Sequence, residues 1–335
     1  MSTFIAIFQR AVVTAISLLF GCTGEIVTEK SGNLNLGVPG VMCVGGISGF
    51  SGALLYEYFW GGAENPNAFL GILIPLIFCL LGSLLMGLIY SFLTTTLRAN
   101  QNVTGLALTI MGVGLSNFLG GFLVKQVDPT AETANISVKV STQYYTAKLP
   151  FASDLGWFGE LFLNYGFLTY VGIVIAVLTA LFIRRTRAGL NLRAVGENPA
   201  TADAAGINVT KYKYMATCVG SMIAGLGGLN YVLNFSSGVW ANDVIEPLGW
   251  TAIALVIFTV WKPHFAIPGA IIFGALTVLP EQMSKFVTLP MDAKPLLRML
   301  PYLVTVTVLV FNSMRKKRET QPPESLGLPY FREDR

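Results

Sequence analysis

The chain has 335 residues, of which 53% are hydrophobic and only 12% are charged, and its formal net charge at pH 7 is +4. Because soluble domains carry about 25% charged residues, this composition, with a mean hydropathy of +0.62, excludes an ordinary soluble domain. In so apolar a chain the positive charges are interpreted by their positions, and their small excess does not predict a nucleic-acid partner.

Nine apolar stretches are candidates for membrane helices, since the hydrocarbon core of a bilayer requires about 20 apolar residues per crossing. In chain order they are residues 4–22, 38–59, 69–93, 105–124, 161–183, 215–233, 248–261, 265–279 and 296–311. The stretches 248–261 and 265–279 are short, which predicts a hairpin of incomplete helices packed inside the bundle. We therefore expect an all-α, polytopic transmembrane helix bundle of about nine spans, within a range of roughly eight to ten.

Lysine and arginine residues set the expected orientation, because the cytoplasmic loops of membrane proteins retain positive charge. With the C-terminus inside, the inner segments contain 15 of the 22 basic residues and the outer segments contain six, while Arg10 lies within the first stretch. The basic residues Arg315 to Arg318 directly follow the last stretch, as a topology anchor does. We expect a multi-pass protein of a bacterial inner membrane, with a transmembrane domain over residues 1–314 and a cytoplasmic tail over residues 315–335.

The longer outer loop covers residues 125–160 and is expected to be extracytoplasmic. Its residues 137–142, Ser-Val-Lys-Val-Ser-Thr, are polar or favour strands. Such a loop is suited to a small cap or to a docking surface on the outer face of the bundle.

The inner loop, residues 184–214, contains the start and stop signals of a short helix over residues 199–205. Asn198 is a good N-cap, Pro199 suits the first helical position, and Gly206 can adopt the left-handed conformation that ends a helix. About two turns of helix are marginal alone in water, so this helix needs a partner or a membrane surface for its order.

The side chains of this inner helix favour a protein partner over the membrane surface. Alanines at positions 200, 202, 204 and 205 allow close approach, and Asp203 and Glu197 offer charge for orientation. A helix that lies on a bilayer presents large apolar residues on one face, and this segment has alanines instead. We therefore predict that Glu197, Asn198, Pro199, Asp203 and Gly206 contact a cytoplasmic partner.

Two segments are candidates for the path of a transported solute, because transporter sites lie near broken or short helices. In the first, Asn33 and Asn35 precede a glycine-rich run that begins at Gly37. The asparagines either cap the incoming helix or face the pathway and form part of a gate. For the glycines, helix packing is the stronger interpretation, as it is for the small-residue repeats within residues 112–120 and 220–228.

The second candidate segment is the predicted late hairpin, with Trp240, Glu246 and Trp250 at its outer mouth. A carboxylate and an aromatic ring at this place are suited to a sugar or a base, although we interpret both tryptophans as interfacial anchors. His264 is the one histidine of the chain, and no Asp, Glu or Cys cluster surrounds it in the sequence. We therefore predict neither a metal site nor a catalytic site.

Three stretches of the sequence resemble ABC importer permeases. Residues 193–199, Arg-Ala-Val-Gly-Glu-Asn-Pro, with residues 205–209, Ala-Gly-Ile-Asn-Val, resemble the cytoplasmic coupling segment of the sugar, nucleoside and branched-chain amino acid group. Residues 29–37, Glu-Lys-Ser-Gly-Asn-Leu-Asn-Leu-Gly, and 267–274, Ile-Pro-Gly-Ala-Ile-Ile-Phe-Gly, resemble segments of its nucleoside and simple-sugar branch.

That resemblance implies the permease subunit of an ATP-driven importer for a small polar solute, nearest to a nucleoside or a simple sugar. It also implies a second permease subunit of the same or a homologous chain, a pair of cytoplasmic ABC ATPases and an extracytoplasmic substrate-binding protein. The chain has no Gly-x-x-x-x-Gly-Lys-Ser/Thr phosphate loop. We therefore expect it to bind no cofactor itself, and we expect ATP and Mg²⁺ on the ATPase subunits.

The alternative is a secondary transporter or channel that works without an ATPase. Ion-coupled transporters usually place ionisable residues inside their spans, despite a cost of roughly 2.5–3.5 kcal/mol on insertion scales. With Arg298 counted in the outer segment, Arg10 and Glu57 are the ionisable residues inside the predicted spans. This scarcity favours the ATP-driven permease.

Overall fold

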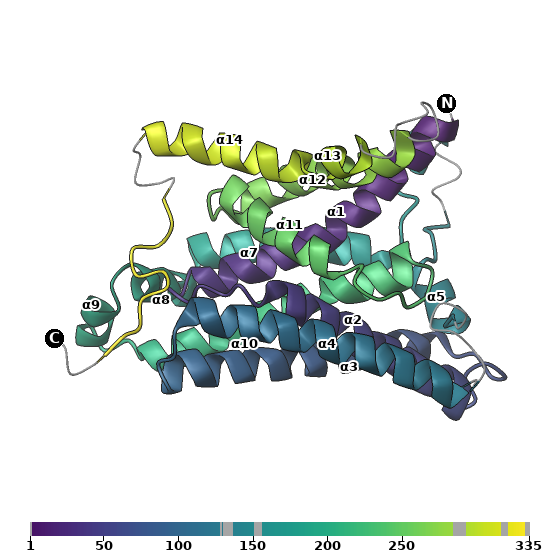
Figure 1. Ribbon diagram of the computed structural model, residues 1–335, viewed down its shortest axis with the longest axis horizontal. Coiled ribbons are helices and arrows are strands. Elements are labelled where there is room, and N and C mark those ends of the chain that lie inside the picture. The colour runs from purple at the N-terminus through teal and green to yellow at the C-terminus, as the bar shows by residue number, and fades with distance from the viewer. Residues whose placement is uncertain are drawn as a thin grey trace.

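A computed structural model of the chain describes residues 2–127, 129, 137–150, 156–283, 293–315 and 321–331. Within these residues the fold is a bundle of helices without a strand (Figure 1). Seven helices of this described part are long and apolar enough to cross a membrane, and two shorter apolar helices accompany them. The nine are α1 (Ser2–Glu29), α2 (Val38–Leu54), α3 (Ala68–Ser91), α4 (Gln101–Val127), α7 (Phe167–Arg185), α10 (Val209–Asn230), α11 (Glu246–Phe258), α12 (Pro263–Met283) and α14 (Leu300–Arg315). The expected all-α bundle is confirmed.

The remaining helical elements are short. Three of them are π-helical turns that extend α2, α3 and α10: η1 (Leu55–Phe59), η2 (Phe92–Thr96) and η4 (Tyr231–Phe235). The others are α5 (Lys139–Tyr145), α6 (Gly156–Phe162), α8 (Arg187–Glu197), α9 (Pro199–Ala204) and α13 (Ala293–Arg298). Turns of π-helix are rare and often lie near functional sites, and η4 indeed borders a cavity described below.

Several helix boundaries differ from the predicted ones, and three of the differences have a clear cause or consequence in the packing. α1 extends past its predicted end because Glu25 and Glu29 are buried between helices rather than exposed in a loop. α7 begins after Gly166, where an added Cβ would lie 2.0 Å from the carbonyl oxygen of Tyr145, so the chain passes this point without a side chain. α12 is 21 residues long, a full span, which leaves α11, at 13 residues, as the one short arm of the late hairpin.

The apolar helices run between two ends of the bundle (Figure 1). One end, here called the α9 end, carries α8, α9, the α1–α2 turn (residues 30–37) and residues 321–331. The other end, here called the α5 end, carries α5, the α2–α3 loop and residues 236–245. Among the described residues, the segments that the charge pattern predicts to be inner share the α9 end, and those that it predicts to be outer share the α5 end.

The centre of the bundle is formed by α1, α2 and α10, which pack at close range through glycines. A Cβ added at Gly45 would lie 2.5 Å from the Cα of Gly225, and one added at Gly24 would lie 2.2 Å from the carbonyl oxygen of Gly220. Membrane helices characteristically pack through small residues, because these let the backbones approach closely. The helix-packing interpretation of the glycine-rich run is therefore confirmed.

The described part of the predicted outer loop is helical where its residues favour strands. At the start of α5 the backbone N–H groups of Lys139 and Ser141 each donate to a carboxylate oxygen of Glu57 at 2.8 Å. Glu57 is 4% exposed, and a carboxylate at a helix N-terminus satisfies donors that the helix itself leaves unpaired. Residues 128, 130–136 and 151–155 of this loop, and residues 316–318 of the predicted basic anchor, lie outside the described residues.

Trp240 is a core residue of the α5 end. Its side chain is 2% exposed, and its ring centroid lies 6.1 Å from that of Phe50. A Cβ added at Gly120 would lie 2.2 Å from the indole nitrogen, so the absence of a side chain at this position makes room for the ring. The interpretation of Trp240 as an interfacial anchor was therefore wrong.

Candidate functional site

The short helix predicted in the inner loop is α9. The Oδ1 atom of Asn198 accepts a hydrogen bond from the backbone N–H of Thr201 at 3.0 Å, and Pro199 occupies the first helical position. Gly206 follows the helix with φ = +82°, the left-handed conformation that ends a helix. The local structure predicted for this segment is therefore confirmed.

α9 is held in place by the bundle. Ala202 is 3% exposed and packs with Val195 of α8 and Val209 of α10 in a small apolar cluster. α8 is capped in turn by Thr186, whose hydroxyl accepts from the backbone N–H of Gly189 at 3.0 Å. A helix of six residues has too few hydrogen bonds of its own to be stable in water, so this cluster orders it.

The other side of α9 faces away from the bundle. The exposed residues on and beside the helix are Glu197, Asn198, Thr201, Ala204, Ala205 and Gly206. Asp203 is half-buried, and its Oδ2 atom accepts from the hydroxyl of Tyr330 at 2.8 Å. Of the two predicted orienting charges, Glu197 therefore lies on the exposed side, whereas Asp203 binds another segment of the same chain.

A cavity of about 670 Å³ lies beside α9, between the start of α10 and the end of η2. Its lining residues are Thr95, Arg98, Asp203, Gly206, Ile207, Asn208, Val209, Thr210, Lys211 and Tyr330. Two of these residues, Arg98 and Lys211, are basic, and one, Asp203, is acidic. Together with the exposed side of α9, this cavity gives the α9 end a protrusion and an adjacent hollow.

Asn33, Asn35 and Gly37 lie together in the α1–α2 turn. The Oδ1 atom of Asn35 accepts from the backbone N–H of Gly37 at 2.9 Å, while its own backbone N–H and Nδ2 donate to the carboxylate of Glu25. Asn33 donates through Nδ2 to the hydroxyl of Thr217 at 3.0 Å, and its Oδ1 is buried without a hydrogen-bond partner among the described residues. The N-cap residue of α2 is Gly37, and α2 has no side-chain cap hydrogen bond, so the capping interpretation was wrong. Asn35 instead orders the turn before the helix, and Asn33 connects the turn to α10.

Two buried carboxylates lie where α1 reaches this turn. Glu25 is 1% exposed and is bound by Asn35, and Glu29 is 4% exposed and accepts from the indole N–H of Trp261. The count of ionisable residues in the predicted spans missed both, because the first predicted span ended too early. The scarcity of such residues therefore no longer argues against ion coupling.

The α1–α2 turn is in direct contact with the end of α8. A Cβ added at Gly196 would lie 2.3 Å from the carbonyl oxygen of Lys30, so the two backbones touch. Burial lowers the pKa of the Lys30 ammonium, and the nearby carboxylate of Glu197 acts in the opposite direction by favouring the charged form. The turn that carries Asn35 and the segment that carries α9 therefore meet through backbone contact and through charge.

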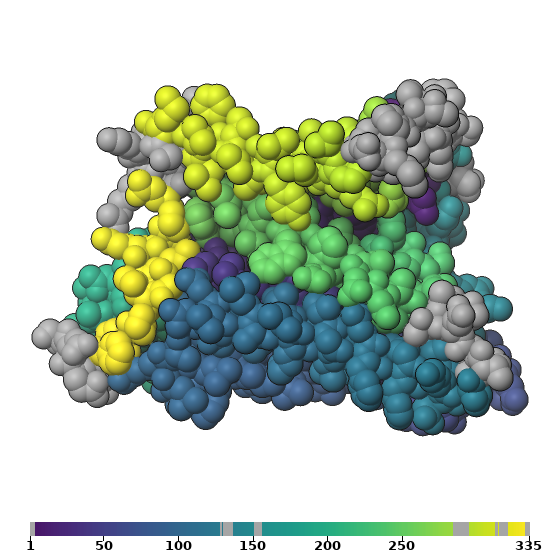
Figure 2. Space-filling view, viewed as in Figure 1, coloured from purple at the N-terminus to yellow at the C-terminus, as the bar shows by residue number. Residues whose placement is uncertain are grey.

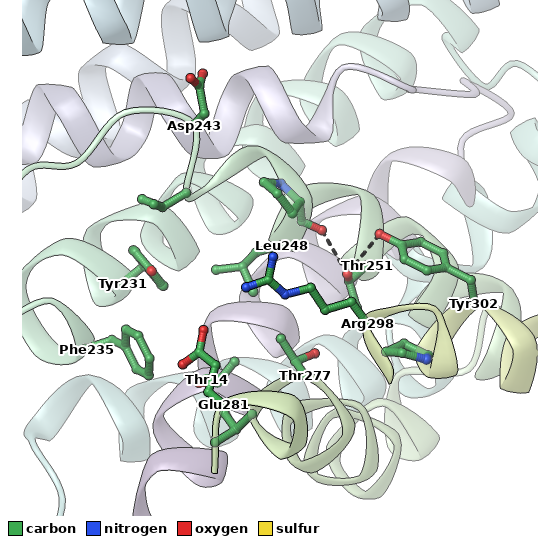
Figure 3. A pocket seen from close by; sticks show the side chains of 14 residues that line it. Thr14, Tyr231, Phe235, Asp243, Leu248, Thr251, Thr277, Glu281, Arg298 and Tyr302 are labelled. Carbon is green, nitrogen blue, oxygen red and sulfur yellow. Dashed lines mark hydrogen bonds between the residues drawn. The ribbon is translucent and has the colours of Figure 1, made fainter. Parts of the chain in front are cut away.

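A second cavity, of about 360 Å³, lies in the half of the bundle nearer the α5 end (Figure 3). It is bounded by α1, η4, α11, α12 and the α13–α14 segment, and Figure 2 shows a hollow between α11 and that segment. Its lining residues are Thr14, Tyr231, Phe235, Asp243, Val244, Pro247, Leu248, Thr251, Thr277, Val278, Glu281, Arg298, Pro301 and Tyr302. We call it the outer cavity.

The outer cavity combines hydroxyl groups with two acidic residues, Asp243 and Glu281, and one basic residue, Arg298. In Figure 3 the guanidinium of Arg298 and the carboxylate of Glu281 both point into it. The hydroxyls of Thr251 and Tyr302 lie 3.3 Å apart on its wall. The hydroxyl of Thr14 is buried and has no hydrogen-bond partner among the described residues. Such a lining can donate and accept several hydrogen bonds to a neutral polar solute.

Glu246, the fourth predicted pathway residue, lies near the outer cavity but does not line it. Its Oε1 atom accepts from the indole N–H of Trp250 at 3.3 Å, at the start of α11. The predicted pathway residues are thus divided between the two ends of the bundle and do not form one site. The sequence analysis did not predict Glu281 and Arg298 as pathway residues. The available signal was that each is a charged residue at the predicted outer end of an apolar stretch.

The family model of the permease component of branched-chain amino acid transport systems matches residues 6–309, which is nearly the whole helical bundle. The chain belongs to this family. It is therefore a multi-pass membrane protein and a permease of the ABC transporter class, and the secondary-transporter alternative is not favoured.

Named relatives cover almost the full length of this permease. The guanosine ABC transporter permease NupQ of Bacillus subtilis is 27% identical over 97% of this chain and 96% of its own. The nucleoside ABC transporter permease NupC of Lactococcus lactis is 29% identical over 90% of each. TsgC13 of Haloferax volcanii, provisionally named a glucose ABC transporter permease, is 29% identical over 99% of each. Among solved structures, PsaBC from Streptococcus pneumoniae in complex with Fab matches 93% of this chain and 92% of that chain, at 13% identity and a TM-score of 0.46.

Proposed function

We propose that this permease is the membrane-spanning subunit of an importer that takes up a nucleoside or a simple sugar across a bacterial cell membrane. Membership of the family supports the permease role, and the names of NupQ, NupC and TsgC13 support the two solute classes. In this proposal a separate pair of ABC ATPases binds ATP and Mg²⁺, and an extracytoplasmic binding protein delivers the solute. The sequence has no phosphate loop of its own, in agreement with that division of tasks.

One observation carries the proposal: α9 is a capped helix with one face anchored in the bundle and the other face exposed and small-sided. A helix that merely lay on the bilayer would expose large apolar side chains. We therefore propose that the α9 end is cytoplasmic and that α9, with Glu197 and Gly206 on its exposed side, docks on an ATPase. Movement of the ATPase would then reach the bundle through α8, α10 and the α1–α2 turn.

The partner permease is proposed to be a homologous chain rather than an identical one. Lactococcus lactis has two relatives of this chain, NupC at 29% identity and NupB at 22%, and both are named nucleoside ABC transporter permeases. Two Mycoplasma genitalium proteins, MG121 and MG120, likewise match this chain at 26% and 24% identity. This chain covers 90% of NupC and 88% of MG121, against 71% of NupB and 44% of MG120, which supports a resemblance to NupC and MG121.

We propose that the solute passes the outer cavity before it reaches a gate at the α1–α2 turn. The hydroxyls of Thr14, Thr251 and Tyr302 suit the hydroxyl groups that a ribose and a simple sugar share, and Arg298 and Glu281 add a strong donor and a strong acceptor. At the other end, Asn33 keeps a buried acceptor without a partner among the described residues. The turn that begins α2 is therefore the proposed inner gate.

Affinity purification of the tagged chain from its native membrane in mild detergent tests the assembly. We expect an ABC ATPase and a second, homologous permease to be recovered with it, as identified by mass spectrometry. Reconstitution of the purified complex with labelled nucleosides and simple sugars then tests the solute class. A chain that is recovered without an ATPase, and whose solute uptake continues in the absence of ATP, would contradict the proposal.

A further inference from the structure

Residues 321–331, here called the C-terminal strap, lie along the α9 end of the bundle although they follow α14 in the chain (Figure 1). Both the backbone N–H and the hydroxyl of Ser325 donate to the carbonyl oxygen of Gly196 at the end of α8. Two residues further, the backbone N–H of Gly327 donates to the carbonyl oxygen of Gly32 at 3.1 Å. The strap is therefore bonded at successive positions to the α8–α9 segment and to the α1–α2 turn.

The crossing of these three segments leaves no room for additional side chains. Gly32 has φ = +86°, and a Cβ added there would lie 2.8 Å from the hydroxyl of Ser325. A Cβ added at Gly196 would lie 3.2 Å from the backbone nitrogen of Gly32. Ser325 itself is 6% exposed. Since a closely packed contact transmits displacement rather than absorbing it, a shift of one segment must move the others.

The end of the strap reaches α9 itself. The hydroxyl of Tyr330 donates to Asp203 of α9 at 2.8 Å, and the ring of Tyr330 packs against the apolar cluster of Val195 and Ala202. The guanidinium of Arg98, beyond η2, lies over the ring of Phe331 at 4.6 Å from its centroid. Figure 2 shows the atoms of the strap between the α8–α9 segment and the atoms of α3 and α4. Through this contact with Arg98 the strap is also connected to the chain that follows α3 and η2.

We propose that the C-terminal strap is a positioning element of transport: through Tyr330 and Ser325 it holds α9 and the α1–α2 turn as one unit, so that displacement of α9 moves the gate. The inference rests on the proposed function, because it requires an ATPase that moves α9. It goes beyond docking, because the strap acts on what happens after the ATPase has bound. Asn35, which accepts from the backbone N–H of Gly37, and Asn33, which is bonded to α10, lie in the turn to which the strap is fixed.

The chemistry of the strap distinguishes this proposal from ordinary packing of a terminal segment. Its contacts are directed hydrogen bonds to Gly196 of α8, Gly32 of the α1–α2 turn and Asp203 of α9. A tail that merely covered apolar surface would stabilise the fold and leave the ratio of solute uptake to ATP hydrolysis unchanged. A coupling element changes that ratio, because movement of α9 is then only partly transmitted to the turn.

The experiment uses the whole reconstituted transporter, with its partner permease, ATPase and binding protein, in proteoliposomes. The variants are Tyr330→Phe, which removes the hydroxyl bonded to Asp203, and a chain that ends at residue 320. Tyr165→Phe is the matched control, because it removes a tyrosine hydroxyl that donates to a carbonyl oxygen, that of Leu161, at 2.7 Å. The measurements are the recovery of the ATPase with the permease, the rate of ATP hydrolysis, and the solute taken up per ATP hydrolysed.

We expect the shortened chain to retain the ATPase and to hydrolyse ATP, but to take up about fivefold less solute per ATP, the lower edge of common coupling effects. Tyr330→Phe is expected to shift the ratio in the same direction by a smaller factor, and Tyr165→Phe to leave it unchanged. If the shortened chain fails to insert, Tyr330→Phe carries the test, since it removes a single oxygen atom.

Two results would overturn the inference alone. One is an unchanged ratio in both variants, which would make the strap ordinary packing. The other is loss of the ATPase from the complex of either variant, which would make the strap part of the docking surface. An unsubstituted complex that contains no ATPase would overturn the proposed function, and the inference with it.

Discussion

The two ends of the bundle are built in different ways. At the α9 end, turns and short helices are fixed by bonds in which main-chain groups take part: Asn198 caps α9, Asn35 accepts from the backbone N–H of Gly37, and Ser325 binds the carbonyl oxygen of Gly196. The outer cavity is instead bounded by side chains from separate helices, and the hydroxyl of Thr14 has no partner among the described residues. The first arrangement suits the transmission of movement, and the second suits rearrangement around a solute.

This difference gives each end its own expected phenotype. Changes at the α9 end should affect the partnership with the ATPase or the yield of transport per ATP. Changes in the outer cavity should affect the apparent affinity for the solute and leave the ATPase in place. A variant that produced the phenotype of the opposite end would break the comparison.

The largest effect is expected for Gly206→Leu. Gly206 has φ = +82°, and a Cβ added there meets no atom within 4 Å, so the substitution acts through the backbone rather than through a clash. A left-handed conformation costs a residue with a side chain roughly 1–2 kcal/mol, which is comparable to the stability of a two-turn helix. We expect α9 to lose its defined end, the ATPase to be lost from the purified complex, and uptake to fall about tenfold or more.

Gly61→Leu is the matched control for this variant. Gly61 also has a positive φ, +72°, and also has open space around it, but it lies in the α2–α3 loop at the α5 end. We expect the ATPase to remain bound in this control. Normal uptake by Gly206→Leu, or equal losses in both variants, would show that the end of α9 has no special role.

An intermediate effect is expected for Arg298→Gln in the outer cavity. The guanidinium of Arg298 points into the cavity, and a hydrogen bond to a charged group contributes about 1.5–3 kcal/mol. We expect the apparent KM for the solute to rise about tenfold or more, while the ATPase stays bound and ATP hydrolysis continues. Uptake measured over a range of solute concentrations separates this change in KM from a change in maximal rate.

The control for the cavity variant is Lys125→Gln, which removes an exposed positive charge at the same end of the bundle, on α4. We expect its KM to equal that of the unsubstituted permease. An unchanged KM in Arg298→Gln would remove the outer cavity from the proposed pathway. Loss of the ATPase in this variant would contradict the division between the two ends.

The features that sequence analysis found are those whose signals are local. The residues from Asn198 to Gly206 are enough to predict where α9 begins and ends, because capping and the left-handed residue after the helix depend on residue types within a few positions. The same holds for the glycines of α2, since small residues spaced along one helix mark a packing face whatever helix packs there.

The features that it missed depend on contacts between distant parts of the chain. Tyr330 lies 127 positions from Asp203, and nothing near either residue indicates that they meet. The end of α1 was misjudged for a related reason: Glu25 has the character of a loop residue unless Asn35 of the next turn supplies its hydrogen bonds. Trp240 was assigned to the membrane interface because the space for its ring is provided by Gly120, and the sequence around Trp240 does not indicate that the two residues meet.

The smallest effect is expected for Glu57→Gln at the α5 end. The two carboxylate oxygens of Glu57 accept from the backbone N–H groups of Lys139 and Ser141, although Glu57 and Lys139 are 82 positions apart. Glutamine offers one acceptor oxygen and places an NH₂ group against the other donor, so one N–H at the start of α5 loses its partner. Loss of a helix cap costs about 0.5–2 kcal/mol. We expect faster amide hydrogen exchange confined to residues 139–145, measured by mass spectrometry, and an unchanged uptake per ATP.

Glu64→Gln is the control, because it changes an exposed carboxylate in the nearby α2–α3 loop and should leave the hydrogen exchange of α5 unchanged. This variant pair sharpens the comparison between the ends. Because α5 lies at the end opposite α9 and stays bonded to α3 through the hydroxyl of Tyr145, its loosening should not reach the ATPase. If Glu57→Gln lowered the solute taken up per ATP, as the strap variants are expected to do, coupling would depend on both ends of the bundle. The strap and the α1–α2 turn would then have no special role in coupling.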